Sequence, residues 1–217
     1  MNDFTNYPVT LVLIAANVLI SLMAFNNQDL YSKTIMWPYG VKRYNQFYRF
    51  ITSGFIHADY VHLFFNMFTL FFFGQVVEQY FKGLELGGAI AYLALYFLGL
   101  IASDLPTYLK QKDNYNYHCL GASGAVSAVV FAAIVFNPWG RIYLYGALGI
   151  SAALYAVLYI VYCVSMSRRG SDHINHDAHL WGSLFGLGFT ITLIAAIQPG
   201  LFEYILEQLK NPSLFGR

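Results

Sequence analysis

Long apolar stretches separated by short polar segments dominate the sequence. Six of them are close to the roughly 20 residues that a helix needs to cross the hydrocarbon core of a bilayer. They lie at residues 8–25, 59–77, 84–103, 120–136, 142–166 and 178–197. Their ends carry turn residues or charges, as in Asn137-Pro138-Trp139-Gly140 after the fourth stretch. The pattern predicts an all-α membrane protein with six transmembrane helices, in a single domain over residues 1–217.

Two further segments have a different pattern. Residues 26–58 form a long connection that is rich in aromatic residues, which favour the headgroup region of a bilayer. After the sixth stretch, apolar residues recur at helical spacing opposite charged ones over residues 201–210. We expect the first segment to lie in the membrane interface and the second to form a short amphipathic helix on the membrane surface.

The composition agrees with a membrane protein. Hydrophobic residues make up 58% of the chain and charged residues 11%, whereas soluble domains carry about 25% charged residues. The net charge is +1 and there is no basic run, so nothing in the sequence favours nucleic-acid binding. Cys119 and Cys163 lie in or beside apolar stretches, and we interpret them as unpaired core residues.

Polar side chains inside membrane spans are costly, so each one is a functional hypothesis. His62 and Asn66 lie four residues apart in the second stretch, hence on one helix face. Ser123 and His179 lie near the starts of the fourth and sixth stretches. Consecutive spans alternate in direction, so these three helices start on the same membrane side. At 1.5 Å per residue, all four side chains lie roughly 5–12 Å below that surface. The pattern predicts a single site.

Small residues indicate which helices touch. They recur every four positions in the fourth and sixth stretches, as Gly124, Ala128 and Ala132 in one and Ala178, Gly182 and Gly186 in the other. Such stripes allow transmembrane backbones to approach closely. Packing of one stripe on the other would bring His179 to Ser123.

This pair suits nucleophilic catalysis. A serine hydroxyl needs a base to take its proton, and a neutral imidazole can do so near pH 7. The oxyanion that then forms needs hydrogen-bond donors, which the Ser123 backbone N–H, the Asn66 amide and a His62 N–H can supply. Asp177 is two residues before His179 and therefore points to another face. We interpret the site as a Ser123–His179 dyad.

At these residues the sequence resembles the rhomboid family of intramembrane serine proteases. The similarity rests on three motifs in the same order along the chain: Gly121-Ala122-Ser123-Gly124, the His62/Asn66 pair, and Ala178-His179-x-x-Gly182-x-x-x-Gly186. The resemblance implies a rhomboid-type six-helix bundle that hydrolyses peptide bonds in transmembrane protein substrates, with no metal or cofactor. It also implies that the fifth helix acts as a gate and the loop before the sixth helix as a cap.

The resemblance also guides the finer expectations. We expect Phe65 and Tyr159 to be the contacts at which the fifth helix closes on the second. The family layout places the N-terminus in the cytoplasm, so we expect a bacterial inner membrane with the active site opening to the extracytoplasmic side. This orientation puts eight Lys and Arg residues outside and four inside, the reverse of the bias that the positive-inside rule predicts.

The sequence departs from the family pattern at three places. Rhomboids often carry Trp-Arg in the first loop, where this chain has Tyr48-Arg49. An aromatic residue commonly follows the nucleophile by four positions and stacks on the catalytic histidine, but here that position is Ser127. At the end of the second helix, rhomboids carry an element of the form G-x-x-x-E-x-x-x-G. The corresponding residues here, Gly74, Glu78 and Gly83, span one residue more.

Several alternatives stay open. The protein could be a catalytically inactive relative that binds and routes membrane proteins, or a small transporter or channel subunit. His173, His176 and His179 follow one another at intervals of three and could bind a metal. Glu78 and Lys82, four residues apart, could form an ordinary ion pair at a helix end.

Overall fold

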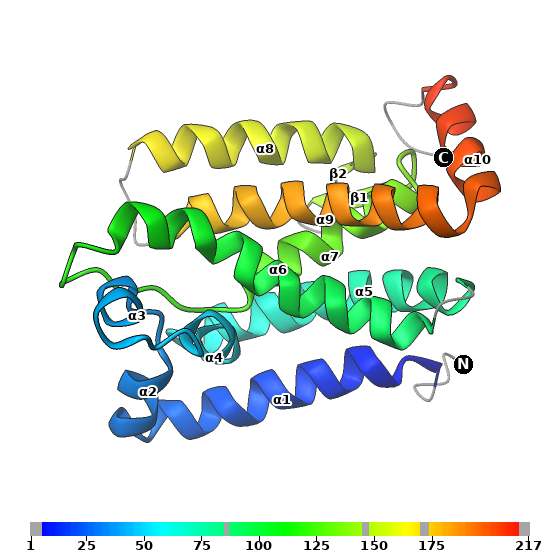
Figure 1. Ribbon diagram of the computed structural model, residues 1–217. Helices are drawn as coiled ribbons and strands as arrows, with labels where there is room; N and C mark the ends of the chain where they lie inside the picture. Colours follow the sequence, from blue (N-terminus) through cyan, green and yellow to red (C-terminus); the bar gives the residue numbers. More distant parts are fainter. Residues whose placement is uncertain (1–5, 85–86, 145–147, 170–173, 213–217) are drawn as a thin grey trace.

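The computed structural model describes residues 6–84, 87–144, 148–169 and 174–212. Within these ranges the elements are α1 (Pro8–Phe25), α2 (Gln28–Thr34), α3 (Pro38–Tyr44), α4 (Arg49–Thr52), a 3-10 turn (Ser53–Phe55), α5 (Tyr60–Lys82), α6 (Gly88–Gln111), α7 (Ser123–Phe136), β1 (Arg141–Leu144), β2 (Leu148–Ser151), α8 (Ala152–Arg169), α9 (His176–Ile197) and α10 (Pro199–Leu209). The long helices run side by side as a bundle (Figure 1).

The long helices have the lengths and compositions of membrane spans. Among the described residues, α1, α5, α6 and α9 are each long and apolar enough to cross a bilayer, and α7 is a shorter apolar helix. Only 28–33% of the most apolar window of each long helix is buried inside the protein, so most of it is half-buried or exposed. The prediction of a helical membrane bundle is therefore confirmed. The number six stays a prediction, with α7 and α8 as the two remaining helices.

Helix α7 is the centre of the bundle. Every residue of α7 after Ser123 is buried, because α5, α6 and α9 all pack against it. An apolar helix that is covered on all sides is typical of a core position rather than a lipid-facing one. This helix carries the predicted nucleophile at its first residue, so the surrounding helices hold Ser123 in place.

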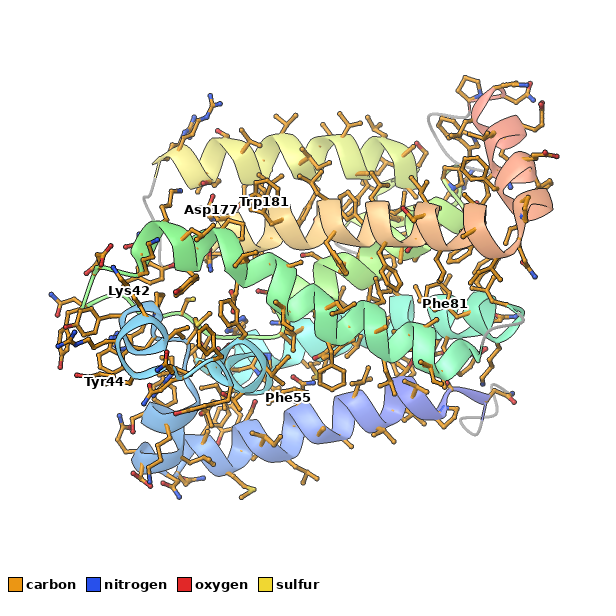
Figure 2. The ribbon with its side chains drawn as sticks, in the orientation of Figure 1. Lys42, Tyr44, Phe55, Phe81, Asp177 and Trp181 are labelled. Atoms are coloured by element: carbon orange, nitrogen blue, oxygen red, sulfur yellow. The ribbon has the colours of Figure 1, made fainter. Side chains whose placement is uncertain are left out.

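The two ends of the bundle differ. Figure 1 shows α2, α3 and α4 gathered at one end and the two chain termini at the other. Helices α5, α7 and α9 all start at the end that carries α2 to α4, as the alternation of spans predicts. In Figure 2, Lys42, Tyr44 and Asp177 lie toward that end, whereas Phe81 lies near the opposite one.

The first connection is organised around Arg49. Its side chain is buried and donates from Nη1 to the carbonyl oxygens of Ile35 (2.5 Å) and Ser32 (3.0 Å), and from Nε to Oε1 of Gln46 (2.7 Å). Hydrogen bonds to a charged donor are stronger than neutral ones, so this one side chain fixes α2, α3 and α4 relative to one another. An arginine follows Tyr48 here as it follows tryptophan in many rhomboids.

Residues 141–144 and 148–151 differ from the prediction, which placed the start of the fifth helix at residue 142. They form an antiparallel pair, β1 and β2, with Ile142 opposite Ile150 and Tyr143 opposite Gly149. The helix α8 begins only at Ala152. β-branched and aromatic residues favour strands, and Gly149 weakens a helix, so the local preferences act against helix here despite the apolar run.

Helix α6 is longer than predicted. It continues from the expected end at residue 103 to Gln111, with Pro106 inside it. Thr107 and Tyr108 explain the extension, because Thr107 Oγ1 donates to Asn175 Oδ1 (3.1 Å) and Tyr108 packs against Phe50. These tertiary contacts outweigh the helix-breaking tendency of the proline. The connection before Ser123 is correspondingly shorter than the gap between the third and fourth predicted stretches.

Glu78 does more than form an ion pair at a helix end. Its carboxylate is buried and accepts hydrogen bonds from the backbone N–H groups of Val9 (3.1 Å) and Thr10 (2.9 Å) and from the Thr10 hydroxyl (2.7 Å). It therefore caps the N-terminus of α1 from 68 residues away. Lys82 Nζ lies 3.7 Å from the same carboxylate and is a secondary partner. The expected Glu78–Lys82 ion pair is therefore present, but the buried carboxylate also binds the start of α1.

The predicted C-terminal amphipathic helix is present as α10. Ile205 is buried against the bundle, and the indole N–H of Trp139 donates to the carbonyl oxygen of Gln208 at 2.6 Å. The helix thus packs on the end of the bundle where the termini lie (Figure 1).

Candidate active site

A cavity of about 800 Å³ opens between α5, α7, α8 and α9, near the end of the bundle that carries α2 to α4. Its walls include every residue that the sequence singled out for catalysis or gating, namely His62, Phe65, Asn66, Ser123, Tyr159 and His179. These residues come from four helices and lie up to 117 positions apart in the sequence, from His62 to His179. The structure thus gathers the whole predicted set around one space.

The start of α5 places His62 and Asn66. Asp59 caps this helix, because its Oδ1 accepts from the backbone N–H of His62 at 2.7 Å. Asn66 follows one turn later and is buried, and its Nδ2 donates to the carbonyl oxygen of His62 at 3.0 Å. An amide nitrogen carries two hydrogens, so a second donor remains on Asn66 at the cavity wall.

Gly121 brings the Ser123 segment against His62. Its φ of +118° is a conformation that favours glycine, and a Cβ there would lie 2.7 Å from Cε1 of the His62 ring. The Gly121 N–H donates to the carbonyl oxygen of Ser53 at 2.9 Å, which anchors the turn to the first connection. The first glycine of the Gly121-Ala122-Ser123-Gly124 motif therefore allows the His62 ring to pack directly against the backbone.

The start of α7 differs from the starts of α5 and α9 in having no side-chain cap. Asp59 and Asn175 cap α5 and α9, whereas Ala122 at the N-cap of α7 offers no side-chain acceptor. The first N–H groups of a helix have no partner within the helix, and the helix dipole adds partial positive charge there. An uncapped start beside Ser123 is therefore suited to binding an oxyanion.

The glycine stripes bring α9 onto α7. A Cβ at Gly182 would overlap the Gly124 backbone, lying 2.9 Å from its carbonyl carbon, and a Cβ at Gly186 would lie 2.5 Å from Cα of Ala128. Neither position has room for a larger residue, since the obstacles are backbone atoms. The predicted packing of the two stripes is confirmed. It places His179, one turn before Gly182, at the same level as the start of α7.

The ring that stacks on His179 comes from α8. Tyr159 lies with its ring centroid 6.4 Å from that of His179, at an interplanar angle of 18°. Its hydroxyl lies 3.2 Å from Oγ of Ser127, which bonds it to α7. Ser127 is the position where relatives commonly place an aromatic residue. In this protein the small Ser127 leaves room for Tyr159 of α8. An aromatic ring therefore still stacks on His179, although it comes from another helix.

Asp177, Phe65 and the loop before α9 lie around the edge of this region. Asp177 pairs with Lys110, whose Nζ lies 2.6 Å from its Oδ2, and its Oδ1 accepts a hydrogen bond from the Ser167 hydroxyl. Phe65 is 61% exposed at the cavity rim. The predicted cap at 167–177 is reduced by the extension of α8 to Arg169 and the start of α9 at His176, and residues 170–173 lie outside the described part.

His57 was not identified from the sequence, and its ring packs against the ring of His62. Its Nδ1 lies 2.9 Å from Oγ of Ser21, and its ring meets the His62 ring edge to face, with centroids 5.0 Å apart. Burial, with a smaller contribution from His62, lowers the pKa of His57 to about 3, so it is neutral at physiological pH. His57 belongs to the connection rather than to a predicted span, and a search for polar residues inside spans passes over it.

Residues able to bind a metal also lie beside the site. The ligating atoms of Cys163, His176 and His179 all lie within 4.8 Å of one another. His173, the third histidine of the spacing noted in the sequence, lies outside the described residues. The cysteine from α8 therefore takes its place in the cluster that the structure describes.

Comparisons with known proteins indicate the family. The rhomboid domain family matches residues 44–196, which include α5 to α8 and nearly all of α9. The Bacillus subtilis (strain 168) protein named "Putative rhomboid protease YdcA" is 28% identical over 182 residues, covering 81% of this chain and 83% of that protein. Two Arabidopsis thaliana proteins, RHOMBOID-like protein 12, mitochondrial, and RHOMBOID-like protein 6, mitochondrial, are 28% and 29% identical over 183 and 174 residues.

The alignments with the two Arabidopsis proteins cover 80% and 79% of this chain but 54% and 50% of those proteins, so the chain spans about half their length. The family match, in contrast, takes in most of this chain and includes the motifs on α5, α7 and α9. Together with the apolar spans, it establishes that this multi-pass integral membrane protein belongs to the rhomboid family.

Proposed function

We propose that the protein is an intramembrane serine endopeptidase that cleaves transmembrane protein substrates, with Ser123 as nucleophile and His179 as base. One observation carries the proposal: a single cavity is lined by Ser123, His179, His62 and Asn66, each from the first two turns of its helix. Membership of a family that includes a protease-named relative supports it.

In the first step, the Ser123 hydroxyl attacks the carbonyl carbon of the scissile peptide bond while His179 takes its proton. The neutral imidazole has one nitrogen with a free electron pair and one that carries hydrogen, so only one nitrogen can act as base. The stack with Tyr159 fixes the plane of the ring, and the packing of Gly182 on Gly124 fixes the start of α9. Such positioning reduces the entropy cost of reaching the transition state.

The negative charge that forms on the carbonyl oxygen needs donors at that point. The Ser123 N–H at the uncapped start of α7, the remaining Asn66 amide hydrogen and a ring N–H of His62 would supply them, since all three residues line the cavity. His179 then gives its proton to the leaving amine. Water attacks the acyl-serine with His179 again as base, and the second product leaves with Ser123 restored.

The cavity also offers a route for a substrate from the bilayer. Its walls include Phe65 and Thr69 of α5 on one side and Tyr155 and Tyr159 of α8 on the other, over the covered face of α7. Helix α8 packs mainly on α9 and α7 rather than on α5. We therefore propose that a transmembrane substrate enters between α5 and α8, with Phe65 and Tyr159 at the entrance.

We propose a bacterial inner membrane and a cavity that opens to the extracytoplasmic side. The basic residues at the α2 to α4 end have partners within the protein. Lys33, Lys42 and Lys110 each form an ion pair with an aspartate, and Arg49 binds backbone carbonyl oxygens. In a protein whose Cys119 and Cys163 are replaced by serine, Tyr44→Cys should react with a membrane-impermeant maleimide added to intact cells, and Lys210→Cys should not. The reverse pattern would refute this orientation.

The main experiment is labelling of the detergent-purified protein with a fluorophosphonate serine probe, run beside cleavage of a transmembrane reporter substrate. Wild type should react with both. Ser123→Ala and His179→Ala should abolish both while the protein stays folded, since losing either member costs on the order of 10⁶-fold in serine–histidine hydrolases. Ser127→Ala is the matched control, because this hydroxyl lines the same cavity one turn further on and its loss should leave Ser123 labelled.

The outcomes separate the candidate functions. Labelling that survives Ser123→Ala would identify another nucleophile. A folded wild-type protein that neither reacts with the probe nor cleaves the reporter, yet retains transmembrane proteins when purified, would instead be the inactive binding factor considered above.

A further inference from the structure

Cys163, His176 and His179 form a compact cluster at the junction of α8 and α9. His176 and His179 are three residues apart at the start of α9, hence on one helix face, and Cys163 faces them from α8. The three ligating atoms lie within 4.8 Å of one another. Cys163 and His176 are buried, at 0% and 3% exposure, whereas His179 is half-buried and reaches the cavity.

We propose that this cluster is a binding site for Zn²⁺, and that zinc bound there switches off the protease. The site itself stands on the geometry of the three side chains. The inhibition rests on the proposed function, because it assumes that His179 is the catalytic base.

The donor set suits zinc. One thiolate and two imidazoles are ligands that Zn²⁺ binds in tetrahedral sites, with bonds of about 2.3 Å to sulfur and about 2.0–2.1 Å to nitrogen. Those bond lengths place neighbouring ligand atoms about 3.3–3.6 Å apart, so side-chain rotations need to bring the present atoms closer by at most about 1.5 Å. Harder cations such as Mg²⁺ and Ca²⁺ prefer oxygen ligands and would not compete. On binding, the Cys163 thiol passes its proton to water.

The fourth ligand position would be filled from the cavity. Three protein ligands leave one open position on a tetrahedral ion, and His179 connects the cluster to the cavity where Ser123 lies. A water molecule, or an oxygen of the substrate, can complete the shell. The same cavity provides the path by which the ion enters, since Cys163 and His176 themselves are covered.

Zinc on His179 removes its function as a base whichever nitrogen it occupies. A neutral imidazole has a single nitrogen with a free electron pair. Once the metal takes that pair, the other nitrogen carries the hydrogen, and neither can accept the Ser123 proton. General base catalysis contributes roughly 10²–10⁴-fold, so saturating Zn²⁺ should lower the cleavage rate by about 10²-fold or more.

The test begins with binding, independent of activity. Co²⁺ is added to the full-length protein in detergent, and the charge-transfer band of a cobalt–thiolate bond is followed in the near ultraviolet. Wild type should show the band and lose it when Zn²⁺ displaces the cobalt. Cys163→Ser should lack it. Cys119→Ser is the matched control and should keep it, because Cys119 is the other free cysteine but lies outside the cluster.

The second arm measures cleavage of the transmembrane reporter as Zn²⁺ is added. Wild type and Cys119→Ser should be inhibited by about 10²-fold, with full recovery after EDTA. Cys163→Ser should retain activity in the absence of zinc and need at least a tenfold higher Zn²⁺ concentration for half-inhibition. His176→Gln should weaken inhibition in the same direction, which keeps the test valid if one variant fails to fold.

Three results would overturn the proposal. The first is a wild-type protein without a cobalt–thiolate band. The second is a band that persists in Cys163→Ser, which would place the ion elsewhere. The third is zinc binding through Cys163 with no loss of cleavage, which would exclude His179 as a ligand. Failure of the proposed protease function is distinguishable, because it would abolish reporter cleavage without zinc and leave the cobalt band unchanged.

Discussion

Replacement of Tyr159 separates its two possible roles, holding His179 and closing the entrance between α5 and α8. The ring stacks on His179 with centroids 6.4 Å apart, and its hydroxyl is bonded to Ser127 at 3.2 Å. If the stack orients the base, Tyr159→Ala should slow the chemical step itself. If the side chain only blocks the entrance, the same change should speed cleavage of transmembrane substrates and leave the rate of labelling by a small serine probe unchanged.

The magnitude follows from the interactions that the tyrosine side chain makes. An aromatic pair contributes about 0.5–1.5 kcal/mol beyond its buried area, and each 1.36 kcal/mol of barrier is a factor of ten in rate. Removal of the stack alone therefore predicts a rate reduced by roughly 2- to 13-fold. Tyr159→Phe keeps the ring and removes only the bond to Ser127, so its rate should fall less than that of Tyr159→Ala.

The assay compares two rates for each variant, fluorophosphonate labelling and kcat for the transmembrane reporter. We expect Tyr159→Ala to lower both in parallel, with KM little changed and with an altered dependence of kcat on pH. Phe65→Ala is the matched comparison, because this side chain lies on the same cavity rim but is 61% exposed and makes ring contacts only with its neighbour Phe64 among the described residues. It should speed reporter cleavage and leave labelling unchanged. Faster cleavage by Tyr159→Ala with unchanged labelling would refute the positioning role.

Three further predictions concern other parts of the structure. Asn66→Ala should lower kcat by roughly 10²-fold or less, since other oxyanion donors remain, and a changed KM with constant kcat would make it a substrate-binding residue instead. Glu78→Ala should lower the free energy of unfolding in detergent by roughly 3 kcal/mol, measured by thermal or denaturant unfolding, because α1 loses its cap; an unchanged midpoint would contradict this. His57 is neutral when folded and has an ordinary pKa when unfolded, so acid favours unfolding: stability should fall by about 2 kcal/mol between about pH 7 and pH 5. His57→Gln should remove that part of the pH dependence, and an identical pH profile in the variant would exclude His57 as its source.

Much of the site was predictable because it depends on features that the sequence displays directly. Span length and alternation place the starts of α5, α7 and α9 at one level, and the glycine stripes specify which faces of α7 and α9 meet. The positions of Ser123 and Asn66 follow from these two rules. Gly182 and Gly186 then fix the rotation of α9, which orients His179 toward the start of α7.

The contributions of α8 were not predictable in the same way. This helix has no stripe of small residues, so the sequence does not show which face turns inward, and Tyr159 and Cys163 could not be assigned to His179. The β1–β2 pair was missed because its residues continue the apolar run, and hydrophobic length outweighed local strand preference in the prediction. The contact of Glu78 with Val9 joins distant parts of the chain, and no local spacing marks it.

The complete burial of α7 has a consequence for how the protein relates to bilayers of different thickness. The helix has 14 residues and is therefore about 21 Å long, well short of the roughly 30 Å of a hydrocarbon core. A lipid-facing helix of this length would thin the bilayer around it or tilt, whereas α7 meets only protein and is free of that hydrophobic mismatch. The depth of Ser123 is consequently set by its neighbours in the bundle. A thicker or thinner membrane acts on α1, α5, α6 and α9, and it changes where a transmembrane partner's backbone lies rather than the depth of Ser123.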